Sequence, residues 1–185
     1  LFMKRMILLL IVALITRFSI AQTQEGIIEY AKTQQPAAII EVPYAQNVVE
    51  GALKDYFGRQ GTKAGSSRGL TLYKNVRTDE GSGSPLLDLY FKIDRKSRKE
   101  KDATVIYLTA AHPGENIAAR QSGDRYGIEE ARPFLESIMP ILEAHNLALQ
   151  IVDQENEVKK AERKYKSSVS EGEDLVKRKR SIEDK

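Results

Sequence analysis

The segment Gly65-Ser66-Ser67-Arg68-Gly69 comes nearest to a catalytic motif in this sequence. Its GxSxG spacing is that of the nucleophile elbow of serine hydrolases, in which a strand enters a strained turn and a helix follows, so that the serine is exposed beside its oxyanion donors. Here a helical pattern precedes the motif and a strand pattern follows it. We therefore expect a flexible loop at Ser67, and a small hydrolase is the third of three functional hypotheses.

Two other patterns suggest binding sites but lack the context that such sites need. Residues 58–61 match the GXXG loop with which KH domains clamp a nucleic-acid backbone, but no helix start follows, so we interpret them as a helix end. His112 and Glu115 share the loop sequence HPGEN, where they could bind a ligand or a metal, whereas His145 falls on the packing face of a helix. With two histidines, no cysteine and no HExxH spacing, we expect no metal site, no cofactor and no complete catalytic set.

The densest charge of the chain lies in the sequence RKSRKEK, between two strand patterns. Its basic residues are Arg95, Lys96, Arg98, Lys99 and Lys101. Like charges this close repel one another unless they are solvated or bound to an anionic surface. We expect a solvated hairpin tip that Asp94, Glu100 and Asp102 partly neutralise. Binding of an anionic envelope surface through residues 95–101 is the second hypothesis.

Residues 1–21 have the parts of an export signal in the right order. Met3-Lys4-Arg5 is basic, an apolar run extends from Met6 to Ile15, and Ser19-Ile20-Ala21 places small residues ahead of Gln22. The apolar run is about half as long as a membrane span requires. We therefore predict cleavage after residue 21, a periplasmic or extracellular location, and no stable membrane span afterwards.

Removal of the predicted signal changes the charge of the chain. The sequence contains 29 Lys+Arg and 26 Asp+Glu, and three of the basic residues, Lys4, Arg5 and Arg17, lie within the signal. The signal contains no acidic residue, so the remaining chain is neutral. A neutral exported protein gives no support to nucleic acid as a partner. Because cysteine is absent, disulfides are excluded and packing has to supply the stability.

Residues 36–152 show the pattern of one α+β domain. Short β-branched or alternating apolar runs predict strands at 37–44, 70–77, 86–94 and 103–111. An apolar stripe from Val49 to Phe57 predicts a helix with Asn47 as its N-cap. The order β-α-β-β-β-α predicts a two-layer sandwich with an antiparallel sheet. Residues 22–35 are interpreted as a linker or a weak strand.

A long helical pattern begins at Ile128 and has a wide apolar face up to Val152, with a kink or break expected at Pro140. Residues 153–185 are predicted to continue it as a charged coiled-coil helix. Its seam contains Ile151, Val158, Ala161, Tyr165, Leu175 and Ile182, with polar or small interruptions at Gln154, Ser168, Gly172 and Lys179. Ser170 and Glu173 have capping-box spacing, so a helical hairpin is the alternative. No stop signal follows Ile182, so we expect the helix to belong to a longer reading frame.

Together with the signal, three segments resemble a group of uncharacterised exported bacterial proteins: PAAIIEVPYAQNVVEGALKDYF, LDLYFKIDRKSRKEKDATVIYL and VKKAERKYK. The resemblance covers most of the mature chain and implies a small α+β domain with a charged C-terminal helix, but no activity. The element order is also similar to TATA-binding-protein-like or ferredoxin-like topologies, at the level of fold only. The leading hypothesis is a non-enzymatic exported protein of the cell envelope that self-associates, or docks on a protein partner, through this helix.

Overall fold

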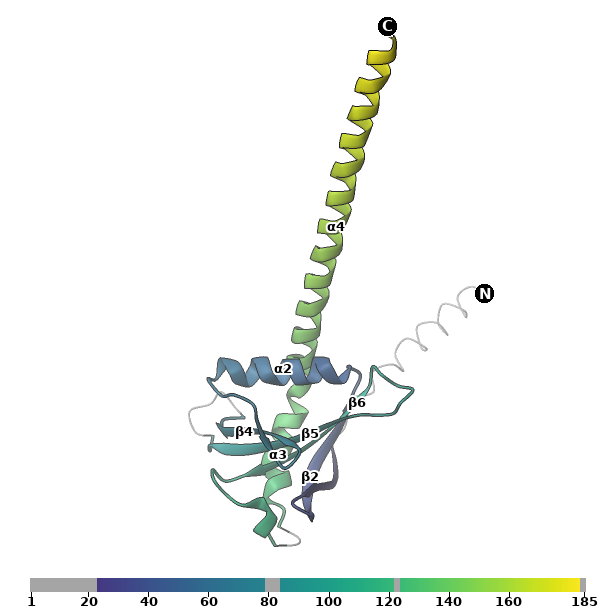
Figure 1. Ribbon diagram of the computed structural model, residues 1–185. Coiled ribbons are helices and arrows are strands. Elements are labelled where there is room, and N and C mark those ends of the chain that lie inside the picture. Colours follow the sequence, from purple (N-terminus) through teal and green to yellow (C-terminus); the bar gives the residue numbers. More distant parts are fainter. Residues whose placement is uncertain (1–22, 79–83, 122–123, 184–185) are drawn as a thin grey trace, which may run out of the picture. The chain divides into compact units, whose positions relative to one another are not determined.

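The computed structural model describes residues 23–78, 84–121 and 124–183 of the chain. The predicted signal at residues 1–21 lies outside the described residues. The chain divides into two compact units, the first ending at Leu142 and the second beginning at Glu143. The elements, in chain order, are β1 (Gln24–Tyr30), β2 (Thr33–Val42), α2 (Gln46–Arg59), β3 (Gly65–Ser67), β4 (Leu70–Val76), β5 (Leu87–Arg95), β6 (Thr104–Ala111), the 3₁₀ helix η1 (Ile117–Ala119), α3 (Tyr126–Glu136) and α4 (Ile138–Glu183) (Figure 1).

The first unit is built on an antiparallel sheet of six strands in the order β1-β2-β6-β5-β4-β3 (Figure 1). The strands from β3 to β6 follow one another as a meander, and β6 pairs with β2, which in turn pairs with β1. The predicted α+β class with an antiparallel sheet is confirmed. Among the described residues, no helix combines the length and the apolar composition that a membrane span requires.

The sheet starts earlier in the chain than predicted. Of the two interpretations of residues 22–35, a linker or a weak strand, the strand is the one found: β1 and the beginning of β2 form a hairpin, and Ala31 and Lys32, both with positive φ, make its turn. The expectation of a domain start at Pro36 is wrong, because Pro36 lies within β2. A proline is tolerated there because β2 pairs with β6 only from Ala38 onward, so the missing N–H of Pro36 leaves that pairing intact. Ser67, expected in a loop, lies at the end of the short edge strand β3.

One face of the sheet carries the main core, to which both α2 and α3 contribute. The alternating residues of β5, such as Leu89, are buried here, together with Leu108 of β6. The ring of Phe57 from α2 packs against Tyr73 of β4 and Phe134 of α3, with centroid distances of 4.3 and 5.5 Å. This aromatic cluster joins both helices to the sheet.

A bulge in β4 changes the face of the sheet to which its side chains point. Simple alternation along the predicted strand 70–77 would place Leu70, Leu72 and Val76 on one face, but the register shifts between Tyr73 and Val76. Asn75 has φ of +53°, a left-handed conformation that asparagine tolerates. As a result Val76 joins Tyr73 in the main core, while Leu70 and Leu72 pack with Tyr30 and Ile117 in a smaller cluster on the opposite face.

Helix α2 buries the apolar stripe that predicts it, including Val49 and Phe57. Its N-cap is Ala45 rather than the expected Asn47, and no side chain caps it. At the other end, Gly61 has φ of +78°, and the Thr62 N–H donates to the Phe57 carbonyl at 3.0 Å. This glycine supplies the left-handed residue that ends a helix.

The predicted break near Pro140 is confirmed but lies at Ser137, between α3 and α4. Pro140 has no N–H for the carbonyl of Glu136, and it fits the first turn of a new helix. At the break itself, the Ser137 hydroxyl donates to the Phe134 carbonyl at 2.9 Å. Packing also ends earlier than the predicted boundary at residue 152, because Leu142 is the last buried residue of α4.

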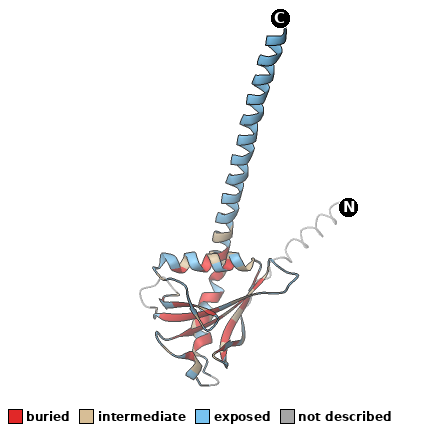
Figure 2. Cartoon of the chain, viewed as in Figure 1, coloured by how far each residue is buried: buried red, intermediate tan, exposed pale blue. Residues whose placement is uncertain are grey.

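The second unit, residues 143–185, consists of the remainder of α4 as far as it is described. The helix is continuous through Ser170 and Glu173, so the helical hairpin is not formed. All described residues from Leu147 onward are exposed, as the pale blue colour in Figure 2 shows.

Candidate functional site

The exposed apolar stripe of α4 is the most extended candidate surface of the described residues. All six predicted seam residues lie on this one helix and are exposed, up to 71% for Tyr165 and 74% for Ile182. Residues three and four apart lie on the same side of a helix. The structure therefore brings Ile151, Val158, Ala161, Tyr165, Leu175 and Ile182 into one stripe, which we call the seam.

The seam follows heptad spacing without a break. In heptad notation, position a contains Ile151, Val158 and Tyr165, and position d contains Ala161, Leu175 and Ile182. The interruptions occupy the same two positions: Gln154 and Ser168 at d, Gly172 and Lys179 at a. Such a stripe is typical of a coiled coil whose partner helix is specified by polar as well as apolar layers.

Contacts within the second unit contribute little to its helical stability. Lys160 and Glu157 form an ion pair of 2.8 Å, and Lys179 and Glu183 one of 3.5 Å. All four side chains are well over half exposed, and such pairs contribute about 0.3–0.5 kcal/mol each. A long helix that is exposed on all sides gains most of its stability when its apolar stripe is buried against another surface.

The five basic residues at the β5–β6 connection do not form one free positive patch. Lys96 makes an ion pair of 2.7 Å with Glu41 and a second of 3.6 Å with Glu100. The hydrogen bond to Glu41 raises the pKa of Lys96. Within the described residues, Arg98 and Lys99 form no ion pair. Lys96 is thus neutralised by acidic partners, whereas Arg98 and Lys99 keep their positive charge exposed.

Arg95 and Lys101 border an open hollow of about 500 Å³ beside the start of α2. Glu50 and Asp102 border the same hollow, so its two basic side chains face two acidic ones. A hollow with balanced charge gives no net attraction for an anion. The residues best placed to contact an anionic surface are therefore Arg98 and Lys99.

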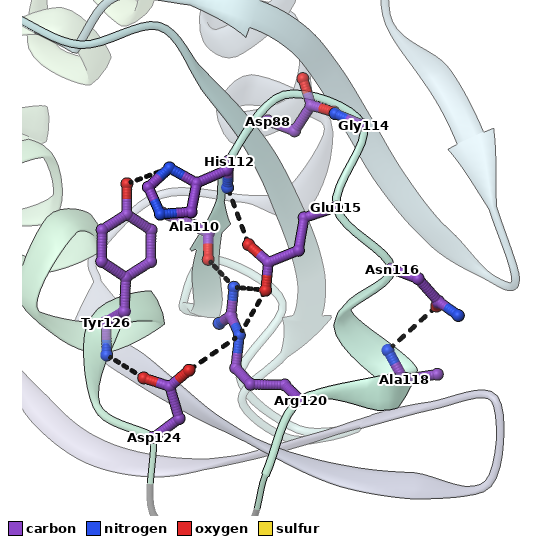
Figure 3. Close-up of polar contacts among 10 residues, drawn as sticks. All are labelled: Asp88, Ala110, His112, Gly114, Glu115, Asn116, Ala118, Arg120, Asp124 and Tyr126. Carbon is purple, nitrogen blue, oxygen red and sulfur yellow. Dashed lines mark hydrogen bonds and ion pairs between the residues drawn. The ribbon is translucent and has the colours of Figure 1, made fainter.

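A polar cluster surrounds the HPGEN loop after β6 (Figure 3). Asp88 is buried, and its carboxylate accepts hydrogen bonds from the backbone N–H groups of Asn75 at 2.9 Å and Gly114 at 3.0 Å. Glu115 accepts from the His112 backbone N–H at 2.9 Å. These carboxylates hold the β4 bulge and the loop in place, because each satisfies backbone donors that would otherwise be unpaired.

Arg120 is the buried centre of this cluster, with only 2% of its side chain exposed. Its Nε donates to Glu115 Oε1 at 3.0 Å, and its Nη2 donates to the Ala110 carbonyl at 3.0 Å (Figure 3). Asp124 lies 3.7 Å from Nε and also accepts from the Tyr126 N–H at the start of α3. The guanidinium therefore ties the end of β6 to the start of α3. Sequence reasoning missed Arg120, since nothing in its local pattern marks a buried charge.

His112 and Glu115, the pair considered as ligands, do not converge on a common point. The His112 ring stacks on Tyr126 with centroids 4.2 Å apart, and Nδ1 lies 3.2 Å from the Tyr126 hydroxyl. Burial is the main cause that raises the pKa of Tyr126. In the described part of the chain, no three His, Asp or Glu side chains are grouped as metal ligands.

Ser67 does not occupy a nucleophile elbow. Arg68 and Gly69, with φ of +50° and +86°, form the tight turn between β3 and β4, so a strand rather than a helix follows the serine. Its hydroxyl lies 2.9 Å from the Tyr30 hydroxyl. The base that activates a serine nucleophile is typically a histidine, and the partner of Ser67 is a phenol hydroxyl. The contact instead links β1 and β3, the two edge strands of the sheet.

Comparisons of the chain with protein-family models, with curated proteins and with solved structures find no match.

Proposed function

We propose that this chain is a non-enzymatic exported protein of the cell envelope that associates, with a second copy or with a protein partner, through the seam of α4. One observation carries the proposal: on a helix of 46 residues, the large apolar side chains at heptad spacing are exposed. Burying such side chains in a helix pair releases about 25 cal/mol per Å² of apolar surface. Export rests on the pattern of residues 1–21 alone.

Two valines of α4 offer a matched test of association. Val158 lies on the seam and is 58% exposed, whereas Val152 lies off the seam and is 52% exposed. Because lysine is the better helix former, Val158→Lys and Val152→Lys should both keep the helix. We expect Val158→Lys to abolish oligomers seen by light scattering after gel filtration, and Val152→Lys to leave them unchanged. Equal behaviour of the two variants contradicts association through the seam.

Export has a separate test. Intact-mass spectrometry of the protein from secreted and envelope fractions should give a chain that begins at Gln22. A chain that retains residues 1–21 in the cytoplasm contradicts export without affecting the proposed association.

A second candidate function is binding of an anionic envelope surface through the β5–β6 connection. The exposure of Arg98 and Lys99, without ion pairs among the described residues, favours it. Binding to vesicles that contain anionic lipid should weaken steeply with salt and with Arg98→Ala and Lys99→Ala. Lys96→Ala should have less effect, because Glu41 already pairs with Lys96 at 2.7 Å. Binding that ignores salt and both substitutions removes this candidate.

A further inference from the structure

We infer that the partner of the seam is a second copy of the same helix, paired antiparallel along the whole length of the seam. The inference rests on the proposed function, which assigns association to this helix, and it adds the partner, the direction and the register. The order of apolar, small and charged residues between Ile151 and Ile182, all on one continuous exposed helix, supports this pairing.

The core layers match in one antiparallel register. In an antiparallel coiled coil, each a residue faces a d residue of the other chain. With Ile151 opposite Ile182 of the second copy, four of the five layers pair residues of the same kind, apolar with apolar, small with small and polar with polar, and the fifth places Tyr165 opposite Ser168. The layers, each occurring twice by symmetry, are Ile151 with Ile182, Val158 with Leu175, Tyr165 with Ser168, Ala161 with Gly172, and Gln154 with Lys179.

The charged residues beside the core support the same register. Antiparallel pairing brings g positions opposite g positions, so Glu157 faces Arg178 of the second copy and Lys164 faces Glu171. Every one of these contacts joins opposite charges. On the other flank, e positions place Glu155 and Glu162 opposite valines. Among the described residues, Lys164 and Arg178 form no ion pair within their own chain, so both are available.

Other arrangements of the same two helices bring like charges together. Sliding one chain by one heptad places Lys164 opposite Lys164 in one direction and opposite Arg178 in the other. A parallel pair in register places Glu157 opposite Glu162 of the second copy, and Lys179 opposite Lys179 in the core. Like-charge pairs at these positions destabilise a coiled coil, so the sequence selects against each alternative.

Antiparallel pairing determines where the two chains enter the coiled coil: they enter it from opposite ends. The seam contains 32 residues from Ile151 to Ile182, so the two entry points are about 47 Å apart at 1.5 Å per residue. A parallel pair would bring both entry points together.

Single cysteines test direction and register, because the natural sequence contains no cysteine. Full-length chains with Ile151→Cys and with Ile182→Cys, one of them carrying a larger tag, are mixed in a glutathione redox buffer. We expect the disulfide to join the two different chains, because each cysteine lies about 47 Å from its own copy. The control pair is Asn156→Cys with Lys177→Cys, at one level of the coiled coil but on its outer side, and should give no cross-link.

The outcomes separate the register from the proposed function. Disulfides between identical chains, or equal cross-linking of the control pair, overturn the antiparallel register while association through α4 stands. A chain that remains monomeric at every concentration in sedimentation velocity overturns the self-pairing, and if it also binds no envelope protein the proposed association through α4 falls with it.

Charge reversal gives a second test, because the same substitution should weaken dimerisation of an antiparallel pair and strengthen dimerisation of a parallel pair. Glu157→Lys turns two attractive contacts into repulsive ones in the antiparallel pair, and should weaken dimerisation by about tenfold. In a parallel pair the same change relieves repulsion with Glu162 and strengthens dimerisation. Adding Arg178→Glu to Glu157→Lys should restore the affinity of the antiparallel pair. Failure of the double variant to recover contradicts the contact between these residues.

Discussion

Gly127 allows a test of the packing that fixes α3 on the sheet. It is buried in the first turn of the helix, and a Cβ there would lie 2.3 Å from Thr109 Oγ1 and 2.4 Å from Arg120 Nη1. The Ala110 carbonyl oxygen would lie 3.1 Å away. Thr109 is stiff because it is β-branched, and Arg120 is held by Glu115 and by that carbonyl. The site therefore has to deform to accept a methyl group.

Two effects of Gly127→Ala oppose each other. Alanine gains up to about 1 kcal/mol over glycine in a helix. Overpacking costs about 1–3 kcal/mol. The guanidinium can move away from the methyl group only by weakening the hydrogen bonds that Nε and Nη2 make, at a further cost of about 1.5–3 kcal/mol. Packing therefore outweighs helix propensity, and we expect the free energy of unfolding to fall by about 1.5–5 kcal/mol.

The matched control is Gly58→Ala in the last turn of α2, where a Cβ would meet no atom within 4 Å. This variant should be unchanged or more stable by up to about 1 kcal/mol. Urea unfolding followed by tyrosine fluorescence reports on the first unit, because Tyr165 is the only one of the 8 tyrosines in the second. If Gly127→Ala proves as stable as Gly58→Ala, the described packing around Arg120 is wrong.

Three further predictions concern the first unit. Phe57→Ala should lower the free energy of unfolding by about 3–5 kcal/mol in the same urea assay, since the ring lies at the centre of the aromatic cluster; a loss below about 1 kcal/mol would contradict this packing. Burial raises the pKa of Tyr73 to about 12 from 10.0, so stability should fall as pH rises through that interval, and less so in Tyr73→Phe. Hydrogen bonding to Arg125, then to Arg132, lowers the pKa of Glu25, so its stabilising effect exists above the ordinary carboxyl pKa and is lost in acid. The stability difference between wild type and Glu25→Gln should therefore shrink as pH falls from 7 to 3, and a difference that is constant with pH argues against these ion pairs.

Regular alternation and helical spacing predict the central strands and the helices. The first strand could be predicted only as an alternative to a linker, and the bulge in β4 could not be predicted, because neither shows regular spacing. Leu87, Leu89 and Phe91 alternate cleanly, and β5 lies in the middle of the sheet, where both neighbours fix its register. β1 was harder to predict because its apolar pair is adjacent: Ile28 is buried while Ile27 is 58% exposed. The bulge at Asn75 carries no periodic signal, since it depends on a hydrogen bond to the distant Asp88.

Of the candidate surfaces, one could be predicted from local spacing and the others depend on residues that are distant in the sequence. The seam could be predicted because it depends on spacing within one helix, from Ile151 to Ile182. The outcome at the basic cluster could not, because Glu41, which neutralises Lys96, comes from another strand. The burial of Arg120 likewise depends on Ala110 and Glu115, which the fold of the loop brings together.

Sedimentation velocity of the intact chain over a wide range of concentrations tests association through the seam. The mass should rise from that of one chain to that of two as concentration increases, and Val158→Lys should keep it at that of one chain. A mass of one chain at every concentration, with no envelope protein bound, would contradict this association.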